Sequence, residues 1–94
     1  MEITRSDIVR STAGRDRGKL FFVVDTDGEF LMLADGKTRR LESPKRKKRK
    51  HTVFVESSDC RVAEKIRSEE KVTNSELRRT LAVYSEDGNP DQEG

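Results

Sequence analysis

The sequence predicts a mainly β fold, a small five-stranded barrel with a helical appendage at its C-terminal end. In the first half of the chain, short apolar runs alternate with turn residues, which is typical of short antiparallel strands. After Glu56 the apolar residues take helical spacing instead. Five short strands favour closure into a barrel, because a closed barrel has no exposed sheet edges. A chain of 94 residues has room for one such domain.

Turn residues divide the first half into its predicted strands. The segment 25–28 is expected to be a hairpin turn, and Asp35 with Gly36 predicts a second, two-residue hairpin. Pro44 ends the strand that follows, since proline donates no hydrogen bond to a ladder. The five expected strands cover residues 8–11, 19–24, 29–34, 37–42 and 51–55.

The second of these strands is apolar on both faces. We expect Leu20, Phe22 and Val24 to line one face, and Phe21 and Val23 to face the other side, beneath the C-terminal tail. A strand that is apolar on both faces implies that another element covers the barrel.

The covering element is predicted to be helical. A first helix is expected over residues 60–68, capped by a polar residue of segment 57–59. Thr73 and Glu76 form a capping-box pattern at the start of a second helix, whose apolar residues recur at helical spacing. The expected division is thus a barrel at 1–56, a helical appendage at 57–84, and a disordered acidic tail at 85–94.

Charge is distributed unevenly along the chain. Residues 1–56 carry 14 Lys or Arg and 9 Asp or Glu, a net of +5, whereas residues 57–94 carry 6 and 9, a net of −3. Six consecutive cations stand at 45–50, and such a run is suited to phosphate contacts that release counterions. A solvated loop or a localisation signal is the alternative reading of the run. The basic half is therefore the predicted surface for a polyanion.

Nothing in the composition favours an enzyme. His51 is the sole histidine and stands beside the basic run, which suits a phosphate contact or a plain strand start better than base catalysis. Cys60 is the sole cysteine, so no disulfide within the chain is expected. The acids Asp25, Asp27 and Glu29 are explained by a hairpin. We expect no catalytic residue, no metal and no cofactor. The absence of a long apolar segment predicts a cytoplasmic protein.

Residues 8–24, with a glycine pair between two hydrophobic strands, resemble the KOW motif. Segments 35–40 and 44–51 are similar to bacterial KOW-domain proteins related to archaeal and eukaryotic large-subunit ribosomal proteins. The resemblance covers about residues 6–55 and implies an SH3-like barrel that binds RNA, commonly ribosomal RNA, through basic loops. Gly14 and Gly18 match the turn of the motif, and Arg15, Arg17 and Lys19 match its basic positions.

The predicted function is recognition of structured RNA by backbone charge and shape. Single-strand binders need exposed aromatic rings, and the four Phe residues all lie in predicted strands. The first alternative is a module that docks a ribosomal or transcription protein, and the second, peripheral membrane binding, lacks an amphipathic insertion helix. The predicted RNA-binding residues are Arg15, Arg17, Lys19, Lys37, Arg39, Arg40, Lys45, Arg46, Lys47, Lys48, Arg49, Lys50 and His51.

Overall fold

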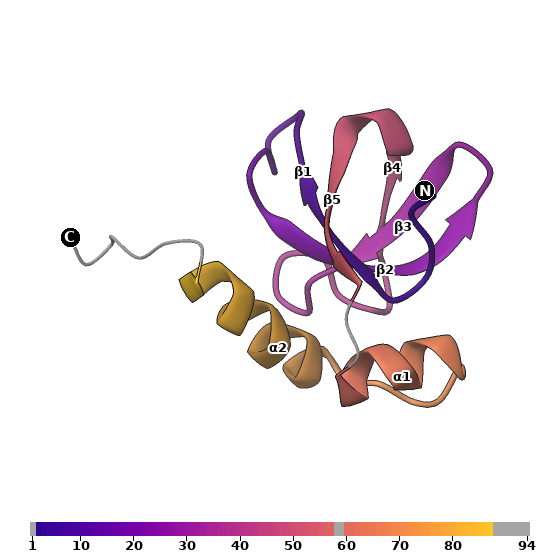
Figure 1. Cartoon of the computed structure of the whole chain (residues 1–94), viewed down its shortest axis with the longest axis vertical. Coiled ribbons are helices and arrows are strands. Elements are labelled where there is room, and N and C mark those ends of the chain that lie inside the picture. The colour runs from indigo at the N-terminus through magenta and orange to yellow at the C-terminus, as the bar shows by residue number, and fades with distance from the viewer. Residues whose placement is uncertain (1, 58–59, 88–94) are drawn as a thin grey trace.

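The computed structural model describes residues 2–57 and 60–87. Its centre is one antiparallel sheet of five strands in the spatial order β4-β3-β2-β1-β5 (Figure 1). The strands are β1 (Asp7–Ser11), β2 (Leu20–Asp27), β3 (Phe30–Ala34), β4 (Lys45–Lys48) and β5 (Thr52–Ser57). The 3₁₀ helix η1 (Arg49–His51) links the last two strands, and the helices α1 (Arg61–Arg67) and α2 (Asn74–Asp87) lie beneath one end of the sheet. A mainly β domain with two C-terminal helices is confirmed.

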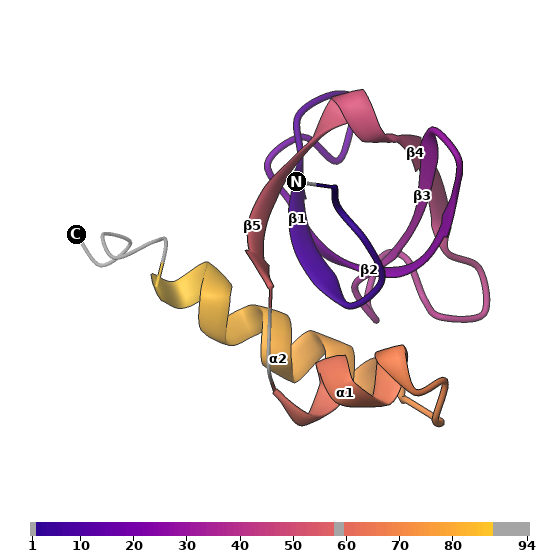
Figure 2. The same ribbon diagram turned by 45° about the vertical axis from the view of Figure 1, so that its right-hand side comes forward.

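The sheet is strongly curled. In Figure 2 the strands follow one another around a curve from β5 through β1, β2 and β3 to β4, and η1 connects the two outer strands. Bulges lie between Ile8 and Val9 in the β1–β5 pairing and between Val23 and Asp25 in the β2–β3 pairing. Bulges bend strands and increase their twist, which accounts for the curl. Within the described residues β4 pairs only with β3 and β5 only with β1, so the sheet is not closed into a barrel.

Two groups of buried side chains cover the two faces of the curled sheet. The inner group, enclosed by the curl, consists of Val9, Phe21, Val23, Leu31 and Leu33. The outer group lies between the sheet and the helices and consists of Ile8, Phe22, Ala34, Val62, Ala63, Ile66, Leu77 and Leu81. Each face of the sheet therefore has its own apolar core.

This arrangement reverses one prediction about β2. Leu20, Phe22 and Val24 face the helices, whereas Phe21 and Val23 point into the curl, so the expectation that these last two lie beneath the tail is wrong. The alternation itself is correct. The two sides were exchanged because both are apolar, and the hydrophobic pattern of such a strand does not distinguish them.

The turn between β2 and β3 lies later than predicted. Asp27 pairs with Phe30, so Gly28 and Glu29 form the turn, and Asp25 and Thr26 still belong to the ladder. The polar residues at the end of β2 are tolerated because this part of the strand is largely exposed. A run of polar residues beside a glycine was therefore a misleading sign of the turn's start.

The predicted fourth strand at 37–42 is wrong, and a loop takes its place. The Asp35 carboxylate accepts hydrogen bonds from the backbone amides of Lys37 at 2.9 Å and Arg39 at 2.8 Å, and from the Thr38 hydroxyl at 2.9 Å. An aspartate that binds the amides following it stabilises a turn of the backbone. Asp35 therefore closes a loop, and the fourth strand forms only at Lys45–Lys48, inside the basic run.

Both helices begin where local chemistry caps them. Cys60 is the cap of α1, and its Sγ accepts a hydrogen bond from the Ala63 amide at 3.5 Å, so the prediction of a cap within 57–59 is wrong. The capping box of α2 is confirmed: the Thr73 amide donates to Glu76 Oε1 at 2.9 Å and the Glu76 amide to Thr73 Oγ1 at 3.2 Å.

The C-terminal helix is longer than predicted. It ends at Asp87, three residues beyond the expected boundary at 84, and the rest of the predicted disordered tail, 88–94, lies outside the described residues. Among the described residues, no helix has the length and apolar character needed to cross a membrane.

Candidate nucleic-acid interface

The loop between β1 and β2 presents three cations to solvent. Gly14 and Gly18 have positive φ angles of 85° and 88°, so the predicted role of this pair in the turn is confirmed. Arg15, Arg17 and Lys19 are exposed, and their side chains make no hydrogen bond or ion pair with the residues that the structure describes. These three charges are available to a ligand.

The basic run is divided by the alternation of β4. Lys45 pairs with Leu33 and Lys47 with Leu31, so these two lysines share the inner face of the sheet with that apolar pair. Lys47 has a side chain only 7% exposed. Its aliphatic stem extends the inner core while its ammonium group requires a partner at the rim.

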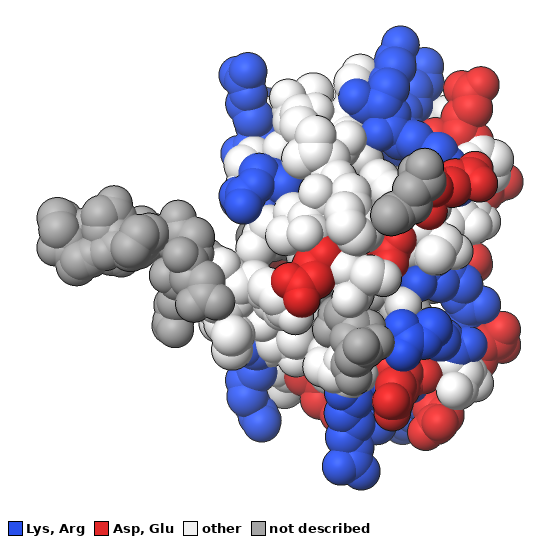
Figure 3. Space-filling model, viewed as in Figure 1, with Lys and Arg blue, Asp and Glu red and all other residues white. Residues whose placement is uncertain are grey.

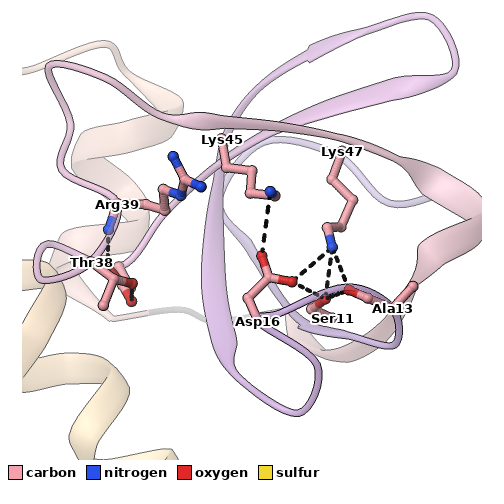
Figure 4. A network of polar contacts seen from close by, with 8 residues as sticks. Ser11, Ala13, Asp16, Thr38, Arg39, Lys45 and Lys47 are labelled. Atoms are coloured by element: carbon pink, nitrogen blue, oxygen red, sulfur yellow. Dashed lines mark hydrogen bonds and ion pairs between the residues drawn. The ribbon is translucent and has the colours of Figure 1, made fainter.

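That partner is the β1–β2 loop (Figure 4). Lys47 Nζ donates hydrogen bonds to Asp16 Oδ1 at 2.8 Å, Ser11 Oγ at 2.9 Å and the Ala13 carbonyl at 2.7 Å, and so uses all three of its protons. Lys45 Nζ lies 3.9 Å from Asp16 Oδ2. The network ties β4 to the loop between β1 and β2, and Lys47 is therefore not free to contact a phosphate.

Asp16 is held in its charged form by this network. Its partial burial would raise the pKa, but hydrogen bonds from Lys47 and Ser11 and the nearby charges of Lys47 and Lys45 outweigh that effect, and the pKa of Asp16 lies below its ordinary value. The side chain is 12% exposed. Asp16 is thus the counter-ion that allows a lysine to point into the curl.

The other two cations of β4 point away from the core. The guanidinium carbon of Arg46 lies 3.7 Å from the centroid of the Phe30 ring, and Arg46 Nη2 is 3.8 Å from Asp27 Oδ2. Lys48 is exposed, and its side chain makes no hydrogen bond or ion pair within the described part of the chain. Of these two side chains, Lys48 is the one whose charge has no described partner.

The cations of η1 likewise include one that is bound within the fold and one that is exposed. Arg49 donates from Nε to the Gly28 carbonyl at 2.7 Å and from Nη1 to the Ile3 carbonyl at 2.6 Å, so it fastens η1 to the β2–β3 turn and to the N-terminal segment. Lys50 is exposed, and His51 is half-buried. The His51 carbonyl accepts a hydrogen bond from the Thr12 amide at 2.9 Å, which places η1 beside the β1–β2 loop.

The loop between β3 and β4 carries Lys37, Arg39 and Arg40, all exposed. Arg40 Nε lies 3.5 Å from a carboxylate oxygen of Glu42, so its charge is partly compensated. The Asn74 amide donates to Glu42 at 2.8 Å and, with the backbone of Glu42 and the charge of Arg40, holds the pKa of that carboxyl below its usual value. Lys37 and Arg39 remain without an acidic partner among the described side chains.

This loop is anchored to the start of α2. Gly36 approaches Asn74 so closely that a Cβ on Gly36 would lie 2.1 Å from the Asn74 carbonyl oxygen, and its φ is 77°. Asn74 Oδ1 accepts a hydrogen bond from the Leu41 amide at 2.8 Å, and Arg78 Nη1 donates to the Gly36 carbonyl at 2.7 Å. Glycine is required here for close approach, which fixes the loop against the helix.

A half-open groove of about 570 Å³ lies between the two loops and α2. Its charged residues are Arg10 of β1, Lys19, Lys37, Asp35 and Arg78 of α2. The remaining lining includes Leu20, Leu81, Ala82 and Tyr84, which provide an apolar floor and one aromatic ring.

The exposed cations therefore belong to three neighbouring segments. Figure 3 shows Lys and Arg side chains projecting from the upper part of the molecule, around the β1–β2 loop and η1, with a largely uncharged area over β5. The exposed cations whose side chains have no described partner are Arg15, Arg17 and Lys19 of the β1–β2 loop, Lys37 and Arg39 of the β3–β4 loop, and Lys48 and Lys50 of the β4–η1 segment. The β1–β2 loop borders both other segments, which lie at opposite ends of β4.

Sequence reasoning missed four residues of this region, which are Asp16, Arg10, Arg78 and Tyr84. Asp16 carried a visible signal, since it is an acid between two arginines in an otherwise basic loop. Arg10 lies near Lys19 because it pairs with Leu20 in the β1–β2 ladder, which a strand register could have indicated, whereas Arg78 carried no signal because its position beside Lys37 depends on how α2 packs. Tyr84 was expected only as an apolar position of the helix.

Among the residues described, no group of three or more His, Cys, Asp or Glu side chains is arranged to hold a metal ion. Comparison of the chain with models of protein families and with curated proteins finds no match.

Proposed function

We propose that the chain binds structured RNA through the exposed cations of its two long loops and the β4–η1 segment. The observation that carries the proposal is the unpaired state of these cations among the described residues, while the acid Asp16 is turned inward to Lys47. Unpaired surface cations that lie together attract a polyanion and release its counterions on contact. The resemblance of residues 6–55 to the KOW motif supports the same conclusion and favours ribosomal RNA within the cytoplasm.

The proposal includes the architecture. We propose that the curled sheet is an SH3-like barrel of the KOW type, and the curl and the η1 link between its outer strands support this. Recognition would rest on backbone charge and shape. Phe21 and Phe22 are fully buried and the ring of Phe30 is stacked against Arg46, which leaves few rings for successive bases.

Fluorescence anisotropy tests the proposal with a folded RNA hairpin, an unstructured RNA strand and a DNA duplex, each across a salt series. The variant replaces Arg15, Arg17, Lys48 and Lys50 by Ser, because these four side chains are exposed and their loss leaves the Lys47 network intact. We expect a preference for the hairpin and a weaker salt dependence in the variant, by about 4 in the slope of log affinity against log salt.

The control replaces Arg61, Lys71 and Arg79 by Ser, three exposed cations on the helical side, and the losses are compared per charge removed. An equal loss of affinity in this control would contradict the location proposed here, and absence of binding to all three nucleic acids at low salt would contradict the function.

A second candidate function is docking of a ribosomal or transcription protein. The observation that favours it is the exposure of apolar side chains on both faces of β5, an end strand of the sheet in which Val53 is 47% exposed and Phe54 41% exposed. End strands accept additional strands from partners. Replacing Val53 and Phe54 by Ser and Thr should abolish such a complex and leave RNA affinity unchanged, which a pull-down with and without nuclease would distinguish.

A further inference from the structure

The groove between the two loops and α2 differs from the rest of the basic surface. Here the cations of the two loops surround a hollow of about 570 Å³ with an apolar floor. Pockets that hold small organic ligands usually have volumes of about 300–1,000 Å³. The groove is thus large enough for a ligand component that enters it.

The position of the groove follows from the packing of α2. Ile8 and Arg10 lie on the same face of β1, and Arg10 pairs with Leu20 of β2. Leu77 and Leu81 of α2 pack in the core with Ile8 and Phe22, while Leu20 packs at the margin of that core, is only half-buried and lines the groove beside the exposed Arg10. An apolar strand position is therefore left open beside cations.

The charge of the groove favours an anion. Four cations line it, Arg10, Lys19, Lys37 and Arg78, against one acid. Both oxygens of that acid, Asp35, already accept hydrogen bonds within its own loop. The side chains of Lys19 and Lys37 make no hydrogen bond or ion pair with described residues, so their ammonium groups are free to bind phosphate oxygens.

The floor favours a flat apolar group beside that anion. Tyr84 is half-buried at the wall of the groove, and Leu20 and Leu81 lie beneath it. An aromatic ring next to cations is the combination that holds a nucleotide, because the base stacks on the ring while the phosphate contacts the charges.

We propose that this groove receives one unpaired nucleotide of the bound RNA, an inference that rests on the proposed RNA-binding function. The base stacks on Tyr84 above Leu20, and its phosphate lies between Lys19 and Lys37. A bulged nucleotide suits the groove because it is already outside the helical stack and entry costs no base pair. The single ring in the groove matches one base rather than a continuous strand.

The test compares two RNA hairpins that differ by a single bulged nucleotide, in anisotropy titrations of the full chain. We expect the bulged hairpin to bind about 5- to 150-fold more tightly, the range given by one base–aromatic stack. The measured quantity is the ratio of the two affinities, since changes in general charge attraction affect both hairpins equally.

Two variants and two controls locate the effect. Tyr84→Leu should bring the ratio close to one, and Lys37→Ser, at an exposed residue whose side chain makes no described contact, should lower it about fivefold. Phe54→Leu removes a ring outside the groove and Lys71→Ser removes a cation outside it, so both should leave the ratio unchanged. Circular dichroism of Tyr84→Leu verifies that the fold is retained.

Each outcome decides the inference. Equal, salt-dependent binding of both hairpins by the native chain would overturn the groove proposal and leave RNA binding in place, whereas failure to bind either hairpin at low salt would overturn both. A bulge preference that survives both Tyr84→Leu and Lys37→Ser would also overturn it. Free mononucleotide that binds as tightly as the bulged hairpin would overturn the assignment of the groove to RNA.

Discussion

Compared with the basic run at 45–50, the β1–β2 loop at 14–19 has fewer cations in the sequence but exposes all of them in the structure. In the sequence the run has six cations and the loop only three, with an acid among them. In the structure Lys47 is buried and Arg49 holds two backbone carbonyls, whereas Arg15, Arg17 and Lys19 are all exposed. The number of cations in a segment is therefore a poor measure of the charge that it offers to a ligand.

The difference arises from the backbone conformation of the two segments. A loop can turn each charged side chain to solvent, but a strand directs alternate residues to opposite faces whatever their chemistry. β4 is an end strand that pairs with β3 alone, and lysines on such a strand discourage pairing with other chains. Asp16 allows this arrangement because it neutralises the lysine that must face inward.

The largest effect should come from removing the buried ammonium group. Lys47→Met leaves Asp16 and Ser11 without their partner and should lower the free energy of unfolding by about 3 kcal/mol. Lys48→Met, one residue along the same strand but exposed, should change it by no more than about 0.5 kcal/mol. Urea denaturation measures both. Similar losses of unfolding free energy in the two variants would contradict the distinction between the inward-facing Lys47 and the outward-facing Lys48.

A smaller loss of unfolding free energy is expected for a substitution in η1. Arg49→Met removes the hydrogen bonds to the carbonyls of Gly28 and Ile3 and should cost about 1–3 kcal/mol. Its matched control is Lys50→Met, at an exposed residue with no described partner, which should be nearly neutral. Thermal melts of the two variants provide the comparison. A stable Arg49→Met protein would place Arg49 among the cations available for RNA.

Sequence reasoning predicted most of the fold because its strongest signals are local. The glycine pair of the β1–β2 loop and the capping box at Thr73 are both confirmed. The fourth strand was misplaced because a run composed entirely of cations has no visible alternation of polar and apolar residues. Asp35 and Gly36 imitate a hairpin, whereas their real role is to bind a loop to Asn74, 38 residues beyond Gly36, and no local pattern carries that information.

The candidate site was also predictable only in part, because sequence patterns indicate local structure and not tertiary contacts. Exposed loop cations such as Arg15 were identified from composition, since charged loop residues normally face solvent. The groove combines the β1–β2 hairpin, the β3–β4 loop and α2, and these three parts meet through tertiary packing. Arg78 and Tyr84 were unremarkable as helix positions until the helix was placed against the sheet.

The Asp16 network also predicts a response to acid. The pKa of Asp16 is lower in the folded chain than its ordinary value of 3.8, so the stability it contributes is present above about pH 4 and is lost as the pH falls through the folded pKa. The difference in unfolding free energy between the native chain and Asp16→Asn should therefore shrink as the pH falls below about 4 and through the lowered pKa of Asp16.

Glu76 provides the comparison for that experiment. Its hydrogen bond from Lys65 and that from the Thr73 amide lower its pKa from 4.5 to about 2, so it is a second carboxyl with a lowered pKa but lies outside the network. Adding Glu76→Gln to both chains should leave the Asp16 difference unchanged. A difference that stays constant as the pH falls below about 4 and through the lowered pKa of Asp16 would mean that Asp16 is not held by its charge.

The smallest effect, on the salt dependence of RNA binding, compares the loop and the run directly. The double variants Arg15→Ser/Arg17→Ser and Lys48→Ser/Lys50→Ser each remove two exposed cations, and each should reduce the slope of log affinity against log salt by about 2. Neither should alter the melting temperature appreciably, because these side chains have no described partners. Lys71→Ser/Arg79→Ser, a pair on the helical side, should leave the slope unchanged. If the run pair alone changed the slope, the loop would be excluded from the interface, and cation density in the sequence would have been the better guide after all.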